Sequence, residues 1–220
     1  MDKFSFDTIE NFDNHIELSI PNYTFMWSLV YNLATYLIKD NTNVYDIGCA
    51  TGLGLRSVCT NDDHSNVQYT GFDISKSLLK NTQQTNNLRY VLDDVSKSEI
   101  QFTNTSLVLS IFTLQFIPIK KRLKLLKKIY KGLNPGGALI ISEKILSKIG
   151  LFQEMFTFCY YDFKLENFTV EEIMKKQNDL RSIMMPITEK ENIKLFKKAG
   201  FAKIASFYQS FNFKAWILVK

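Results

Sequence analysis

Short apolar runs alternate with amphipathic segments along most of this 220-residue chain. Runs with the length and the β-branched or aromatic content of strands occupy residues 43–48, 67–75 and 88–95. Residues 106–117 form a nearly continuous apolar run, as expected for a strand buried on both faces, and 138–144 make a fifth strand. Because helical patterns lie between these runs, the chain predicts βαβ units and a parallel sheet.

The remaining pattern predicts the helices and a different C-terminal end. Residues 201–209 and 212–220 have strand composition and only a short polar joint near Ser210, so they must pair antiparallel. A mainly parallel, Rossmann-like sheet of seven strands that ends in such a hairpin is the layout of class I methyltransferases. It is not the usual nicotinamide-binding arrangement. The expected helices are 53–60, 77–85, 120–132, 169–184 and 188–199, with a turn at 133–137.

Composition is that of a soluble globular protein. The chain is 45% hydrophobic and 22% charged, and no segment has the roughly 18–20 uncharged apolar residues of a membrane span. The polar N-terminal segment does not have the pattern of a secretory signal. Cys49, Cys59 and Cys159 are too scattered for a disulfide framework or a zinc site. We expect a single α/β domain, residues 1–220, in the cytoplasm.

The net charge of +5 comes largely from lysines, many of them in the segment 120–132. These lysines interleave with apolar residues at helical spacing, which favours an amphipathic helix with a solvated basic face over an RNA-binding stripe. His15 and His64 are the only histidines, too few for a histidine-rich metal site or an obvious catalytic triad. We therefore expect no direct nucleic acid, no membrane and no metal ion as partner.

A glycine-rich loop follows the first predicted strand. Gly48, Gly52 and Gly54 follow Asp46 in the spacing D-x-G-x-x-x-G-x-G, which differs from the G-x-G-x-x-G of dinucleotide-binding loops. Structural turns also use glycine, so the loop alone is weak evidence. In a binding site, the glycines would let a ligand pass close to the backbone.

Two further aspartates end the second and third predicted strands. Asp73 lies about 20 residues beyond the glycines, where a carboxylate can accept hydrogen bonds from both ribose hydroxyls. Asp94 can meet an adenine amino group. Each aspartate alone is also a common helix N-cap. Together with Asp46, the three acidic strand ends favour a nucleoside pocket without a diphosphate, which suits S-adenosylmethionine.

Several longer segments are specific enough to indicate a family. They are FTLQFI (112–117), LLKKIYKGLNPGGALIISEK (125–144), DFK (162–164), AGF (199–201), FNF (211–213) and the FD, FD and SIPNY elements within 6–23. Over nearly the whole chain, they resemble carboxy-S-adenosylmethionine synthase and related class I S-adenosylmethionine-dependent methyltransferases. The resemblance implies an N-terminal lid at residues 1–25, a helical cap at 145–187 and a homodimer.

The resemblance also implies which residues hold the cofactor. The positions at which the family binds the cofactor correspond here to Tyr23, Gly48, Cys49, Ala50, Asp73, Ile74, Asp94 and Val95. To this set we add Asp46, Gly52 and Ile111 as expected cofactor-binding residues. The expected substrate-pocket residues are Gln115, Gln177 and Arg181.

At two positions the residue differs from the one that the synthase has. An ungapped match places Gln177 where the synthase has an arginine that meets the carboxyl group of the modified cofactor, and Ile111 where it has an asparagine. Glutamine can hydrogen-bond a carboxylate but cannot neutralise it, and losing one partner of a desolvated charge pair costs about 2–5 kcal/mol. Arg181, Lys175 or Lys176 could substitute, but simple loss is the interpretation we favour. The departures therefore favour methyl transfer.

The expected function is in-line methyl transfer from S-adenosylmethionine to a small-molecule acceptor, with S-adenosylhomocysteine as product. If the acceptor is a protonated amine or a hydroxyl, a base must remove its proton. The candidates for this base are His15, which is also a plausible surface histidine, and Tyr160, Tyr161 or Asp162 in the cap. The aromatic segment 151–163 either lines the acceptor pocket or packs on the core. One alternative is the synthase itself, which uses prephenate and makes carboxy-S-adenosylmethionine for tRNA wobble-uridine modification. Another is a non-catalytic S-adenosylmethionine-binding protein.

Overall fold

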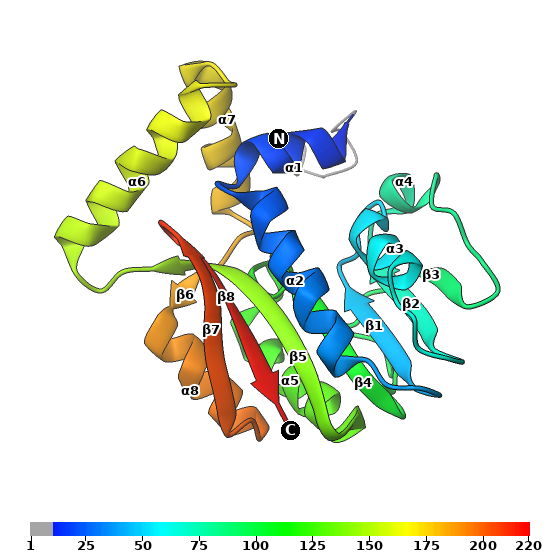
Figure 1. Ribbon diagram of the computed structural model, residues 1–220. Coiled ribbons are helices and arrows are strands. Elements are labelled where there is room, and N and C mark those ends of the chain that lie inside the picture. Colours follow the sequence, from blue (N-terminus) through cyan, green and yellow to red (C-terminus); the bar gives the residue numbers. More distant parts are fainter. Residues whose placement is uncertain (1–10) are drawn as a thin grey trace.

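In the computed structural model, which describes residues 11–220, a mixed sheet runs through the middle of the protein (Figure 1). Its strands are β1 (Asn43–Ile47), β2 (Gln68–Asp73), β3 (Leu88–Leu92), β4 (Thr105–Ile111), β5 (Leu133–Leu146), β6 (Ile187–Thr188), β7 (Lys203–Ser210) and β8 (Phe213–Val219). They lie in the order β3-β2-β1-β4-β5-β8-β7, and the two-residue β6 pairs with β5 off this path.

Strands β1 to β5 pair in parallel, whereas β8 is antiparallel to both β5 and β7. This confirms the predicted class I methyltransferase fold with its C-terminal hairpin. The strand order reverses between the neighbours β1 and β4. In open α/β sheets, ligands bind outside the carboxyl ends of the strands at such a reversal.

Helices cover both faces of the sheet. Helix α2 crosses one face, and α5 and α8 cover the opposite one (Figure 1). The helices are α1 (Phe12–Ser19), α2 (Tyr23–Leu37), α3 (Leu53–Thr60), α4 (Lys76–Leu79), α5 (Ile119–Gly132), α6 (Gly150–Leu165), α7 (Val170–Arg181) and α8 (Glu189–Ala199), with the short 3-10 helix η2 (Leu114–Phe116).

The apolar run of β4 is explained by burial on both faces of the sheet. Leu107 and Leu109 pack in the apolar cluster beneath α2, while Val108 packs in the cluster beneath α5 and α8. Alternate side chains of a strand point to opposite faces. Since both faces are covered by helices, every position of the strand is buried except Ile111 at its end, which is partly exposed.

Three expected element boundaries differ from the structure. The expected strand at 106–117 ends at Ile111, because Phe112 adopts a left-handed conformation (φ +54°) that leaves the sheet. The expected turn at 133–137 lies inside β5, as an irregularity where the register with β4 shifts. The expected helix at 77–85 is only α4, because the polar residues that follow offer no apolar face to bury.

The N-terminal lid was predicted for residues 1–25. Residues 1–10, including the first FD element, lie outside the described residues. The remainder forms α1 and the start of α2. The predicted cap at 145–187 contains α6 and α7, and α6 extends away from the sheet (Figure 1).

Candidate functional site: a cavity at the strand reversal

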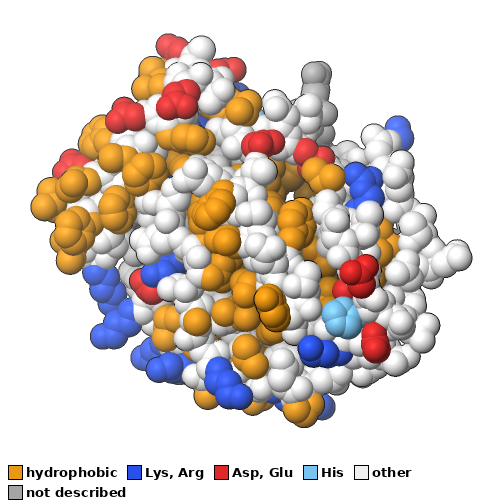
Figure 2. All heavy atoms as spheres, viewed as in Figure 1, with side chains coloured by type: hydrophobic (Ala, Val, Ile, Leu, Met, Phe, Trp, Pro, Cys, Tyr) orange, Lys and Arg blue, Asp and Glu red, His pale blue; other side chains and the backbone are white. Residues whose placement is uncertain are grey.

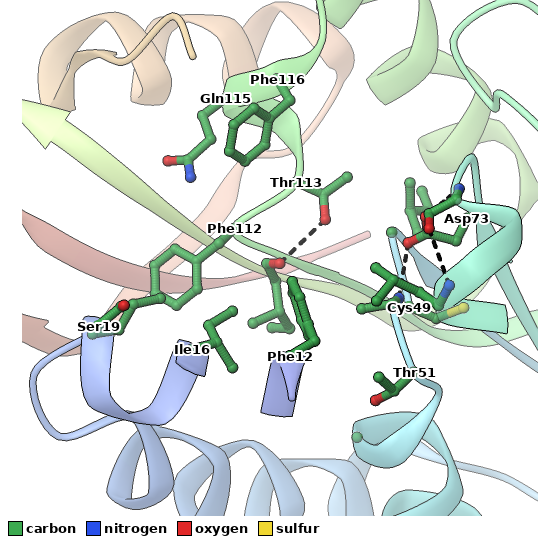
Figure 3. Close-up of a pocket in the computed structure, with 18 of the residues that line it drawn as sticks. Phe12, Ile16, Ser19, Cys49, Thr51, Asp73, Phe112, Thr113, Gln115 and Phe116 are labelled. Atoms are coloured by element: carbon green, nitrogen blue, oxygen red, sulfur yellow. Dashed lines mark hydrogen bonds between the residues drawn. The ribbon is translucent and has the colours of Figure 1, made fainter. Parts of the chain in front are cut away.

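A cavity of about 1120 Å³ lies at the carboxyl ends of β1, β2 and β4, beneath α1 and the start of α2. Figure 3 shows Cys49, Thr51 and Asp73 on one side of it and Phe112 and Gln115 on another. Ten of the expected cofactor residues line it: Tyr23, Asp46, Gly48, Cys49, Ala50, Asp73, Ile74, Asp94, Val95 and Ile111. Gly52 is outside its lining. The structure therefore brings the three acidic strand ends to one cavity.

The loop glycines are explained by packing within the chain. A Cβ on Gly48 would lie 2.2 Å from Oγ1 of Thr113, and a Cβ on Gly52 would lie 2.4 Å from the ring of Tyr90. Both glycines also have positive φ values, +74° and +76°. At Gly54 too, a side chain of this chain occupies the Cβ position. Close contact with neighbouring side chains is therefore sufficient by itself to require glycine here, and Gly48 and Gly54 also line the cavity.

Asp73 fixes the loop after β1. Its Oδ2 accepts the N–H of Ala50 at 2.8 Å, and its Oδ1 accepts the N–H of Ser75 at 2.9 Å (Figure 3). Ala50 has φ +50°, a conformation that non-glycine residues rarely adopt. Asp73 also lines the cavity, where a carboxylate can accept hydrogen bonds from ribose hydroxyls.

Asp46, at the end of β1, is 3% exposed. Within residues 11–220, its Oδ1 has no hydrogen-bond partner. Burial, and secondly the charge of Asp73, raises the pKa of Asp46 to about 8. A buried carboxyl without a partner is costly when ionised, and a nearby positive charge would stabilise it. The site is therefore suited to a ligand that carries a cation.

Asp94 makes local hydrogen bonds at the end of β3. Its Oδ1 accepts the N–H of Ser96 at 3.0 Å and the Oγ–H of Ser96 at 2.6 Å, and its Oδ2 pairs with Nζ of Lys97 at 2.7 Å. Partial burial acts to raise the pKa of Asp94, but the hydrogen bonds from Lys97 and Ser96 lower it overall. The carboxylate thus starts a turn and also lines the cavity.

The candidate bases differ in their placement. His15 lines the cavity, with Nε2 3.4 Å from Oγ of Ser19. Burial, and then the charges of Lys176 and Lys164, lower the pKa of His15 to about 4, so it is neutral and weakly basic near pH 7. Tyr160 lines the cavity as well. Its hydroxyl donates to the backbone oxygen of Ser19 at 3.1 Å, and burial raises its pKa.

The other predicted base and substrate-pocket residues also differ in whether they line the cavity. Tyr161, Asp162 and Arg181 are outside the cavity lining, whereas Gln115 and Gln177 are in it. Oε1 of Gln115 accepts the backbone N–H of Lys144 at 2.7 Å, so this glutamine joins the end of β4 to β5.

The aromatic segment 151–163 forms most of α6. Leu151 and Phe158 are 62% and 59% exposed, and of this segment only Tyr160 lines the cavity. Most of the segment therefore neither forms the cavity wall nor packs into the core.

Three lysines from different elements line part of the cavity: Lys144 on β5, Lys164 on α6 and Lys176 on α7. The sequence indicated only Lys176, as a possible substitute for the synthase arginine. Lys144 ends the apolar run ALIISEK, and Lys164 follows an aromatic run. A lysine that interrupts an apolar segment is the signal that could have identified two of them.

Two other kinds of feature are absent from the part of the chain that the structure describes. Among the described residues, no helix has the length and apolar content needed to cross a bilayer. Within the same residues, no group of three or more histidine, cysteine, aspartate or glutamate side chains is placed to hold a metal ion.

Comparison with known proteins places the chain in a family. A model described as a methyltransferase domain matches residues 44–137. The chain is 38% identical to carboxy-S-adenosyl-L-methionine synthase of Staphylococcus epidermidis, over 97% of this chain and 94% of that protein. It is 33% identical to the synthase of Actinobacillus pleuropneumoniae, over 99% and 93% of the two chains.

Solved structures are similar in fold. Human N-acetylserotonin methyltransferase in complex with S-adenosylmethionine has a TM-score of 0.57 at 16% identity, over 89% of this chain and 52% of that one. An O-methyltransferase-like protein from Nostoc punctiforme has a TM-score of 0.63 at 17% identity, over 89% and 56%.

The fold and the cavity thus define an enzyme of the class I S-adenosylmethionine-dependent kind. Within that class, the chain belongs to the carboxy-S-adenosyl-L-methionine synthase family, and S-adenosyl-L-methionine is its cofactor. The cavity is consistent with this molecule, which carries an ammonium and a sulfonium, because the buried Asp46 oxygen lacks a partner among the described residues.

Proposed function

We propose that this protein is a carboxy-S-adenosyl-L-methionine synthase, which replaces a hydrogen of the cofactor's methyl group with a carboxyl group taken from prephenate. The methyl carbon loses a proton and forms a bond to the carboxyl carbon, while prephenate loses that carboxyl group and its ring hydroxyl to become phenylpyruvate. The proton and the hydroxyl leave as water. The observation that supports this most strongly is 38% identity to a protein of that name over nearly the whole length of both chains. Methyl transfer, which the sequence favoured because of Gln177 and Ile111, is supported less well. In this proposal, Gln177 and Ile111 change the way in which the enzyme holds the carboxyl group and do not change the reaction.

The residues of the cavity have distinct roles in this proposal. Asp73 and Asp94 face the ribose and adenine, and Asp46 faces the positively charged methionine part of the cofactor. Gln115, Gln177 and Ile111 lie in the same lining, where the added carboxyl group or the carboxyl donor would meet them. The enclosing helices α1 and α2 exclude water from the reacting atoms.

A direct assay tests the proposal. Purified enzyme is incubated with S-adenosylmethionine and prephenate, and the products are identified by mass spectrometry. We expect a cofactor heavier by one carboxyl group, formed only when prephenate is present. Formation of S-adenosylhomocysteine with a small-molecule acceptor would instead identify a methyltransferase, and binding without either product would identify a binding protein.

We also propose that the enzyme is a homodimer and acts in the cytoplasm on small molecules, without direct contact with nucleic acid or membrane. An exposed apolar face of α6 and its preceding residue supports the dimer (Figure 2). We call it the α6 face, and it consists of Ile149, Leu151, Phe152, Met155 and Phe158. An apolar patch of this kind marks an interaction surface. The three cysteines are unpaired, which is consistent with a reducing compartment.

A further inference from the structure

One end of the cavity is rich in positive charge. Lys144, Lys164 and Lys176 reach it from three different elements, β5, α6 and α7. In the sheet, β4 separates β5 from β1 and β2, so Lys144 is on the opposite side of the strand reversal from Asp46 and Asp73. The cavity therefore has an acidic half that suits the nucleoside and a basic half that the cofactor's adenosyl group does not require.

The lysines are held against aromatic rings. Nζ of Lys144 lies 4.6 Å from the ring centroid of Tyr160 and 5.6 Å from that of Phe213. Nζ of Lys164 lies 5.8 Å from the same Tyr160 ring and 5.0 Å from that of Phe168. Ring faces attract an ammonium group, but they do not carry a counter-charge. The two ammonium groups thus share one ring, and each is left to repel the other.

No acidic side chain of the described residues forms an ion pair with Lys144 or Lys164. Lys164 is only 5% exposed. The neighbouring Glu143 interacts with Arg122, and alternate side chains of a strand face opposite sides. Glu172, whose charge acts on Lys164, accepts the N–H of Thr169 at 2.8 Å in the capping box of α7. Burial, and then the charge of Lys164, lowers the pKa of Lys144 to about 8, as expected without a counter-charge.

We propose that Lys144 and Lys164, assisted by Lys176, form a subsite that binds a carboxylate of the ligand in this cavity. An organic carboxylate suits the surroundings better than a strongly hydrated inorganic anion, because Phe112 and Phe213 also line this cavity. The identity of the carboxylate rests on the proposed function: we assign it to the group added to the cofactor or to a carboxylate of prephenate. S-adenosylmethionine also carries an amino-acid carboxylate, and the binding measurements below distinguish that third source.

Charge-removing variants with a matched control test the subsite. Lys144→Gln and Lys164→Gln each remove one positive charge from the cavity. Lys175→Gln removes the same charge from α7, but Lys175 is outside the cavity lining and pairs with Asp179 at 3.0 Å. The charge-preserving variants Lys144→Arg and Lys164→Arg show whether the positions tolerate substitution. Thermal unfolding and circular dichroism verify the fold of every variant.

Calorimetry then measures the dissociation constants of S-adenosylmethionine, carboxy-S-adenosylmethionine and prephenate. We expect Lys144→Gln and Lys164→Gln to weaken binding of a carboxylate ligand about tenfold or more, the magnitude of one charge-assisted hydrogen bond, with little change for S-adenosylmethionine. The arginine variants and Lys175→Gln should bind as the wild type does.

The two carboxylate sources give different results. Weakened binding of carboxy-S-adenosylmethionine with unchanged binding of S-adenosylmethionine assigns the subsite to the group added to the cofactor, and weakened binding of prephenate assigns it to the second substrate. Equal weakening of S-adenosylmethionine and its carboxylated form would place the lysines on the amino-acid carboxylate that both share, and would overturn the proposed subsite. Unchanged binding of both in folded glutamine variants, or a wild type that binds neither, overturns the subsite. A wild type that binds carboxylates through these lysines but makes no carboxylated product would refute the proposed function alone.

Discussion

The carboxylate of Asp73 accepts the backbone N–H of Ala50 at 2.8 Å, and so joins the end of β2 to the loop after β1. Ala50 is held at φ +50° in that loop. The residue proposed to bind the ribose is therefore also the residue that shapes the neighbouring cofactor loop. Loop order and cofactor affinity should depend on the same side chain.

Asp73→Asn tests this dependence. Asparagine keeps one oxygen acceptor but removes the charge and places an amide NH2 opposite one of the two backbone donors. Hydrogen bonds to charged groups contribute about 1.5–3 kcal/mol, so we expect roughly 10- to 100-fold weaker binding of S-adenosylmethionine by calorimetry. Asp63→Asn is the control, because Asp63 is exposed and outside the cavity. Unchanged affinity in Asp73→Asn would show that the carboxylate has no part in binding.

Asp46 predicts a pH dependence of stability in the cofactor-free protein. Its pKa is 3.8 ordinarily and about 8 in the fold, so below the lower value it is protonated in both states. As the pH rises from about 4 to about 8, the unfolded chain loses this proton while the folded protein keeps it, and the free energy of unfolding falls. Urea unfolding at several pH values should show a smaller decrease in Asp46→Asn than in the wild type. Equal decreases would contradict the raised pKa.

Gly48 and Thr113 are in close contact at the ends of β1 and β4, so the effects of substituting them on stability should depend on each other. In Gly48→Ala, the new methyl group would overlap Oγ1 and Cγ2 of Thr113 while the backbone keeps φ +74°, so we expect a loss of about 2 kcal/mol or more in stability. Thr113→Ala removes the two nearest overlapping atoms and leaves only Cβ, at 2.9 Å. The double variant should therefore lose less stability than the sum of the single variants. Strict additivity, measured by urea unfolding, would rule out the contact.

If the α6 face forms the dimer interface, a charge placed on it should convert the dimer to a monomer. Phe158→Glu places a charge in the middle of this face, where Phe158 is 59% exposed in the single chain. If the face is buried against a second copy, the variant should be a monomer by light scattering coupled to size exclusion, while the wild type is a dimer. Lys131→Glu, on the distant helix α5, is the control. A wild type that is already monomeric at micromolar concentration would end the dimer proposal.

The sequence predicted the fold well because the sheet leaves a strong pattern. Buried strands such as β4 are continuous apolar runs, and the short joint near Ser210 allows only an antiparallel pair. The acidic strand ends were found for the same reason, since a carboxyl at the end of a buried strand is conspicuous. All three line one cavity.

The parts that the sequence did not predict depend on distant contacts. Nothing in the loop itself indicates that Gly48 faces Thr113, which lies on another strand end. Likewise, Lys144 and Lys164 are far apart in the chain and meet only because α6 places Tyr160 between them. Local pattern can mark each lysine as an interruption of an apolar segment, but it cannot show that the two side chains meet.

The most direct test of the account is a crystal structure of the enzyme with S-adenosylmethionine. We expect the adenosyl group between Asp73 and Asp94, with the ammonium or sulfonium of the cofactor's methionine part against the buried oxygen of Asp46. A cofactor bound outside this cavity, or in it with none of these three carboxylates in contact, would contradict the account.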